Sequence, residues 1–65
     1  MKLISILIPT YNEEQNISLI IDQIIKNIDL KKYDYEIIVI DNFSDDETAN
    51  IVKTKILINK KIKIS

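Results

Sequence analysis

The sequence predicts an α/β fold in which strands and helices alternate in the order β-α-β-α-β around a parallel sheet. Residues 2–8 and 35–40 are short runs of apolar, mostly β-branched side chains, which are typical of strands buried in a parallel sheet. After each run, apolar residues recur with helical spacing. Short connections favour neighbouring parallel strands with right-handed crossovers, so both helices should cover the same face of the sheet.

The first strand is predicted over residues 2–8 and should end at Pro9, because proline cannot donate a hydrogen bond to a sheet ladder. The first helix is predicted over residues 12–28. Asn12 is its expected N-cap, and Glu13 and Glu14 would be favoured by the positive helix start. The buried stripe of this helix should consist of Ile17, Ile20, Ile21, Ile24, Ile25 and Ile28.

The second strand is predicted over residues 35–40, and a second helix should start within residues 42–48. Ser44 followed by Glu47 fits a capping box at that start. Residues 62–65 resemble the beginning of a third strand. The other face of such a sheet would be apolar and uncovered, so the sequence predicts an incomplete sheet, the opening half of a larger domain. The buried face of the second helix should carry Ala49, Val52 and Ile56.

Composition excludes several classes of function. The chain has 65 residues, with no Gly, no Cys and no His, which excludes Gly-rich phosphate loops, zinc sites, and Ser-His-Asp or Cys-His catalysis. The net charge is −1, the body is acidic and the lysines near residue 60 suit the end of a helix, so a nucleic-acid partner is not expected. Residues 3–8 form too short an apolar run for a signal peptide or a membrane span.

Polar side chains follow both predicted strands, where ligands of open α/β sheets bind. The stretch IPTYNE offers Tyr11 as a flat apolar surface, and IDNFSDDE offers Asp41 and Asn42 as hydrogen-bonding groups. An Asx-turn that leads into the helix is an equally good interpretation of Asp41. Three further carboxylates are better explained by the positive helix start than by metal binding: Asp45, Asp46 and Glu47.

These two stretches, joined by an amphipathic helix, resemble the start of family 2 glycosyltransferases, which have a Rossmann-like GT-A fold. Such enzymes move a sugar from a nucleotide-diphosphate sugar to an acceptor. The resemblance covers residues 2–53. It implies that residues 1–65 are the N-terminal, nucleotide-binding part of a truncated glycosyltransferase domain, and that the parent is a nucleotide-sugar glycosyltransferase.

The resemblance also implies a set of nucleotide-binding residues. Asp41 matches an aspartate that mostly shapes the loop, whereas Asn42 replaces a second aspartate that hydrogen-bonds the base in the family. Phe43 departs from the family, which commonly has a small residue at this position. The implied nucleotide-binding residues are Pro9, Tyr11, Glu13, Ile40, Asp41 and Asn42.

The Asn42 amide leads us to expect a UDP-sugar rather than a GDP-sugar, because an amide can accept from the uracil N–H and donate to a neighbouring carbonyl. The family's Asp-x-Asp metal motif and its catalytic base follow the third strand and have no match here. We therefore expect no catalytic residue or metal ligand in this chain, and no sugar transfer by the chain alone. Mg²⁺ or Mn²⁺ and the missing C-terminal part of the domain would complete the enzyme.

Two alternatives stay open. A phospho-acceptor receiver module also places acidic residues after an apolar strand, but it leaves IPTYNE unexplained. A non-catalytic, truncated remnant is the other alternative, and the missing metal motif favours it for the chain taken alone. For a glycosyltransferase or a truncated remnant of one, the expected location is cytoplasmic, at the cytoplasmic face of a membrane if the parent carries a membrane domain.

Overall fold

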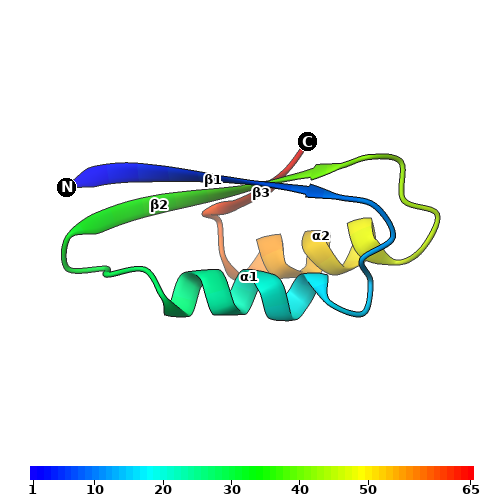
Figure 1. The fold of residues 1–65 in the computed structure, drawn as a ribbon, viewed down its shortest axis with the longest axis horizontal. Coiled ribbons are helices and arrows are strands. Elements are labelled where there is room, and N and C mark those ends of the chain that lie inside the picture. Colours follow the sequence, from blue (N-terminus) through cyan, green and yellow to red (C-terminus); the bar gives the residue numbers. More distant parts are fainter.

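The computed structural model describes all 65 residues and shows a three-stranded parallel sheet with two helices (Figure 1). The strand order is β1-β2-β3, so the chain steps across the sheet in one direction. Both helices consequently lie against the same face of the sheet (Figure 1). The predicted β-α-β-α-β architecture is confirmed. In chain order the elements are β1 (Lys2–Thr10), α1 (Ile17–Lys26), β2 (Tyr33–Asp41), α2 (Thr48–Ile58) and β3 (Ile62–Ile64).

The core lies between the helices and the covered face of the sheet. The central strand β2 contributes most to it, because Tyr35, Ile37 and Val39 alternate onto the helix side and are buried. Full burial of one such aliphatic side chain is worth about 1.5–3 kcal/mol. The predicted apolar stripes of both helices face this core, with Val52 fully buried and Ala49 and Ile56 partly buried. The remaining core residues are Ile17, Ile21 and Ile62.

Helix α1 begins later than predicted. Asn12 is not its N-cap, because the helix begins at Ile17, and Asn12, with a positive φ of 51°, lies four residues before the observed N-cap Asn16. A turn over residues 13–16 follows, and the Glu13 carbonyl accepts from the N–H groups of Asn16 and Ile17 at 3.0 and 2.8 Å. The N-cap is Asn16, so Glu13 and Glu14 lie before the helix rather than in its first turn.

The predicted capping box of α2 is also wrong. The helix begins at Thr48, its N-cap is Glu47, and no side chain of the N-cap residue bonds the helix start. Instead the Asp46 carboxylate accepts from the Thr48 N–H at 2.9 Å and so satisfies one of the free donors at the helix start. Ser44 lies well before the helix and serves the preceding loop.

Strand β1 continues through Pro9 to Thr10, two residues beyond the predicted strand of residues 2–8. Proline is tolerated there because β1 is an edge strand of this sheet, where a missing N–H leaves no neighbouring strand without a donor. The added length matters, since it sets Thr10 directly opposite Asp41.

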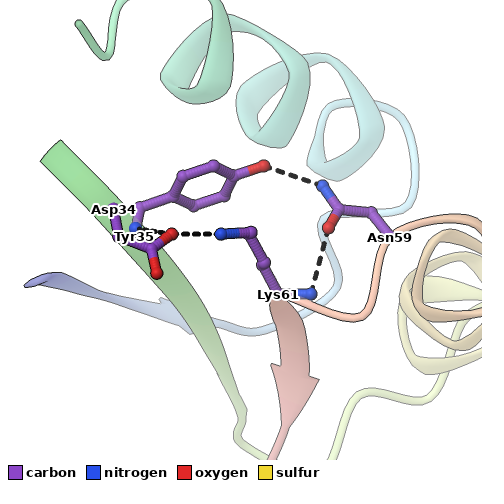
Figure 2. Close-up of polar contacts among 4 residues, drawn as sticks. All are labelled: Asp34, Tyr35, Asn59 and Lys61. Atoms are coloured by element: carbon purple, nitrogen blue, oxygen red, sulfur yellow. Dashed lines mark hydrogen bonds and ion pairs between the residues drawn. The ribbon is translucent and has the colours of Figure 1, made fainter. Parts of the chain in front are cut away.

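A polar cluster fixes the connection between α2 and β3 at the opposite end of the sheet (Figure 2). The Asn59 amide donates to the Tyr35 hydroxyl at 2.9 Å, and its oxygen accepts from the Lys61 N–H at 3.0 Å. The Lys61 ammonium pairs with Asp34 and lies 5.1 Å from the centre of the Tyr35 ring. The ammonium and the Tyr35 N–H, which also donates to Asp34, lower the pKa of the Asp34 carboxyl.

The other face of the sheet is open, as the sequence predicts. Leu3 and Leu7 of β1 are 58% and 59% exposed. The one charged residue of this strand is Lys2 at its start. A polar patch crosses the middle of this face, where Glu36 accepts from the Ser5 hydroxyl and pairs with Lys63. The apolar surface is therefore concentrated on β1, the edge strand without a protective charge at its centre.

We expect the isolated chain to bind a hydrophobic dye such as anilinonaphthalene sulfonate, and to associate as its concentration rises, because this face is apolar. Replacing Leu3 and Leu7 together by Lys should remove most of the dye fluorescence. The matched control, Leu19→Lys with Leu57→Lys, replaces two exposed leucines on the helices and should leave it largely unchanged. A sharp melt of a monomer that binds no dye would contradict this account.

Candidate functional site

The carboxyl ends of β1 and β2 lie side by side because the two strands are parallel and in register to their last residues. Thr10 pairs with Asp41, and the Asn42 N–H donates to the Thr10 carbonyl at 2.8 Å. The Thr10 hydroxyl donates to the Asp41 carboxylate at 3.2 Å. The polar stretches that follow the two strands in sequence therefore begin at one point on the edge of the sheet.

An open hollow of about 410 Å³ lies at this edge and is lined by both stretches. Five of the six predicted nucleotide-binding residues line it. Glu13 does not, because the positive φ at Asn12 turns the chain away just before it. Thr10 was missed by the prediction, although its place beside Tyr11 and opposite Asp41 could have indicated it. The complete lining is Pro9, Thr10, Tyr11, Ile40, Asp41 and Asn42.

Asp41 has the loop-shaping role expected of it. Its carboxylate accepts from the Thr10 hydroxyl, from the Ser44 hydroxyl and from the Ser44 N–H at 3.4 Å. The bonds to Ser44 close a turn of the Asx kind directly after β2. Most of the accepting capacity of this carboxylate is used within the chain. The exposed Asn42 side chain, rather than Asp41, is the group that lines the hollow with its polar atoms free of the loop.

Phe43 follows Asn42 with a positive φ of 56° and a side chain that is 89% exposed. A bulky residue is uncommon in this left-handed region, which costs a residue with a Cβ atom about 1–2 kcal/mol. The ring contributes little burial in return. The loop is therefore formed but strained at Phe43.

Asn12 joins the two loops by a reciprocal pair of hydrogen bonds. Its N–H donates to the Ser44 hydroxyl at 2.9 Å, and its side-chain oxygen accepts from the Asp45 N–H at 2.8 Å. Its neighbour Tyr11 stands at the wall of the hollow, 55% exposed. The loops are thus held to each other, and not only to the strands from which they emerge.

Asp46 and Thr48 make a second set of bonds between the loops. The Asp46 carboxylate accepts from the Glu14 N–H at 3.2 Å and from the Thr48 N–H and hydroxyl, and the Thr48 hydroxyl accepts from the Glu13 N–H at 2.9 Å. Desolvation alone would raise the pKa of Asp46, but the hydrogen bonds from Thr48 and Glu14 outweigh it and lower that pKa. The carboxylate is therefore held in its ionised form by backbone and hydroxyl donors.

A known family matches this arrangement of strands and loops. The sequence profile described as Glycosyl transferase family 2 matches residues 5–64. The chain belongs to glycosyltransferase family 2. The GT-A resemblance of the two loops is thereby confirmed, and the receiver alternative is wrong.

Individual glycosyltransferases are similar over most of the chain. A Methanococcus voltae enzyme named dolichyl N-acetyl-alpha-D-glucosaminyl phosphate 3-beta-D-2,3-diacetamido-2,3-dideoxy-beta-D-glucuronosyltransferase is 42% identical over 53 residues, which are 82% of this chain and 16% of the relative. The poly(ribitol-phosphate) beta-N-acetylglucosaminyltransferase TarP of Staphylococcus aureus is 38% identical over 55 residues, 82% of this chain and 16% of TarP.

A third relative is similar over the same share of the chain. The dolichyl-phosphate beta-glucosyltransferase of Dictyostelium discoideum is 38% identical over 58 residues, 82% of this chain and 18% of that enzyme. The chain thus spans less than a fifth of the length of these curated relatives. No solved structure matches it.

No group of three or more acidic side chains lies close enough together to hold a metal ion. The carboxylates of Asp41 and Asp46 are engaged by hydrogen-bond donors of the two loops instead. The residues present do not fit the divalent cation that the family implies. None of the helices has the length and apolar content needed to cross a bilayer.

We expect Phe43→Gly to raise the free energy of unfolding by up to about 1 kcal/mol. Glycine removes the cost of the left-handed backbone, and the larger conformational entropy that it loses on folding cancels only part of this gain. Phe43→Val should lower it, since β-branched residues tolerate positive φ least. Phe43→Ala keeps the Cβ atom and is the matched control. Urea unfolding followed by circular dichroism measures all three. An equal gain for Ala and Gly would assign the effect to the exposed ring rather than to the backbone.

The lowered pKa of Asp46 makes stability depend on pH in a defined direction. Its contribution is complete above the ordinary aspartate pKa of 3.8 and is lost as the pH falls through the lower pKa of the folded state. The same sign holds for Asp34. Urea unfolding from about pH 6 down to about pH 2 should show this loss. Asp46→Asn should reduce the loss, whereas Asp45→Asn, which removes a carboxylate without such bonds, should not. Identical pH profiles for the two variants would refute the role of Asp46.

Proposed function

We propose that this chain binds the nucleotide of a nucleotide-diphosphate sugar, as the base-binding part of a glycosyltransferase that transfers the sugar to an acceptor. One observation carries the proposal: the hollow at the carboxyl edge of the sheet, which brings Tyr11 and Asn42 together from two loops. This edge is where open α/β sheets bind their ligands. The relatives are named for transferring sugar residues, which agrees with a sugar donor as substrate.

The chemistry of the hollow suits a base. Pro9, Ile40 and the Tyr11 ring supply apolar surface, and the Asn42 amide supplies one donor group and one acceptor at its border. Aromatic rings stack on all of the bases and discriminate little between them. Discrimination between bases must then come from hydrogen bonds, and the exposed Asn42 amide is the side chain best placed to make them.

An amide in this position favours uracil over guanine. Uracil presents one N–H between two carbonyl groups, so the amide can accept from the N–H and donate to a carbonyl at the same time. Guanine presents two adjacent donors beside its carbonyl; a carboxylate can accept from both donors, whereas an amide that bonds the carbonyl and the neighbouring N–H leaves the amino group unmatched. One unmatched polar group costs about 1–3 kcal/mol when it is buried, and less in an open hollow. We therefore propose a UDP-sugar as the donor.

The remaining parts of the catalytic site lie outside residues 1–65 in this proposal. A divalent cation, Mg²⁺ or Mn²⁺, would stabilise the diphosphate as a Lewis acid, and a base would accept the proton of the acceptor hydroxyl. This chain contributes recognition of the base and the placement of the two loops. The cytoplasmic location of the enzyme belongs to the same proposal.

The test is an NMR titration of the ¹⁵N-labelled chain with UDP and with GDP, at a concentration below that at which the chain associates, which measures weak binding and locates it. UDP should bind more tightly and should shift the amide signals of Tyr11 and Asn42. Asn42→Asp should weaken UDP relative to GDP by roughly five- to tenfold, because a carboxylate matches the guanine edge. The ratio of the two affinities is the measured quantity, since a new charge repels both diphosphates alike.

Asn27→Asp is the matched control, because it makes the same chemical change at the far end of α1. It should leave the UDP-to-GDP ratio unchanged. Tighter binding of GDP by the unmodified chain, or an unchanged ratio in Asn42→Asp, would show that Asn42 does not recognise the base. Shifts located away from the two loops would refute the base site itself.

A further inference from the structure

We propose that Asn12 is a positioning residue, which fixes Tyr11 at the wall of the hollow by locking the first loop onto the second. The proposal rests on the proposed base-binding function and deepens it. Asn12 does not line the hollow, so its role would be exerted through Tyr11. Two features of Asn12 carry the argument, its backbone conformation and its bonds across the loops.

The backbone conformation excludes the ordinary explanation of this asparagine. Asn12 has a φ of 51° and lies before the turn that precedes α1, so it caps no helix. Asparagine is one of the few residues that tolerate the left-handed region, which reverses the chain here. The reversal ends β1 and directs Glu13 and Glu14 toward the start of α2, where their N–H groups bond Thr48 and Asp46.

The bonds of Asn12 reach residues more than 30 positions away in the sequence. The N–H bond to Ser44 and the side-chain bond from Asp45 both fall directly after Phe43, at the end of the turn that Asp41 closes. One residue of the first loop therefore holds the second loop two and three residues after Asn42. The same residue follows Tyr11 immediately, so the clamp sets the spacing between the two side chains proposed to hold the base.

Tyr11 needs such a clamp because packing does not fix it. Its side chain is 55% exposed and it is not part of the buried core. On its other side Thr10 is held by the strand pairing and by Asp41. With Asn12 bonded as well, the Tyr11 backbone is held from both sides, and less freedom remains to be lost when a base stacks on the ring.

The first arm of the test uses no nucleotide. In the unmodified chain the amides of Asn12 and Asp45 should exchange slowly with solvent, and ¹⁵N relaxation should show an ordered Tyr11 amide. Asn12→Gly permits the left-handed backbone and removes the side-chain acceptor, so it should leave the fold intact and raise the mobility of the Tyr11 amide. Asn16→Gly is the matched control, because the Asn16 side chain contacts only Glu13 of its own loop. Rapid exchange at both amides, or an unchanged Tyr11 in Asn12→Gly, would overturn the proposal.

The second arm measures the affinity for uridine, a neutral probe, in a double-mutant cycle. Asn12→Gly should weaken binding roughly two- to tenfold, and Tyr11→Ala should weaken it more. In the Tyr11→Ala background the further effect of Asn12→Gly should disappear, because a residue that acts through Tyr11 has nothing left to position. Additive effects would show a general structural role instead and would overturn the proposal.

The two arms separate this inference from the base-binding proposal. If the unmodified chain does not bind uridine but Asn12→Gly mobilises Tyr11, the base site is refuted and the positioning of Tyr11 by Asn12 stands. If uridine binds and Asn12→Gly changes neither Tyr11 nor the affinity, the base site stands and the role of Asn12 is refuted.

Discussion

The parallel pairing of β1 with β2 is the constraint on which the rest of the molecule depends. It runs in register to Thr10 and Asp41, and so both loops leave the sheet at the same point. The pairing also forces α1 to cross one face as the connection between the strands, and the one-way strand order places α2 on that face too. The core, the hollow and the open face all follow from this pairing.

The density of carboxylates after β2 has a structural explanation. Asp41 closes the turn behind the strand and holds Thr10, while Asp46 gathers donors from the first loop and from the start of α2. Both carboxylates accept hydrogen bonds from loop N–H and hydroxyl groups that would otherwise bond water. This leaves Asn42, which directly follows β2, as the polar side chain at this edge that is free to face a ligand.

The sheet is built asymmetrically. Its covered face has a closed core around Ile37 and Val39, with no buried side-chain polar atom left without a partner. Its open face combines the exposed leucines of β1 with a paired Glu36 and Lys63. The hollow lies at the edge between the two faces, since Pro9 and Ile40 belong to the open side and Thr10 and Asp41 to the covered side. Whatever contacts the open face would therefore also border the proposed base site.

The sequence by itself determined the order of elements, the parallel sheet, the apolar stripes and the edge where the loops meet, because these depend on periodicities within each segment. It also identified five of the six residues that line the hollow. The tertiary structure alone decided where the helices begin and what Asn12, Ser44 and Asp46 do. Local preferences favoured Asn12 and Ser44 as helix caps, but each bonds the other loop, more than 30 residues away, and Ser44 also bonds Asp41 of its own loop. Only the strand pairing brings those partners within hydrogen-bonding distance, and bonds between distant segments then outweigh the local ones.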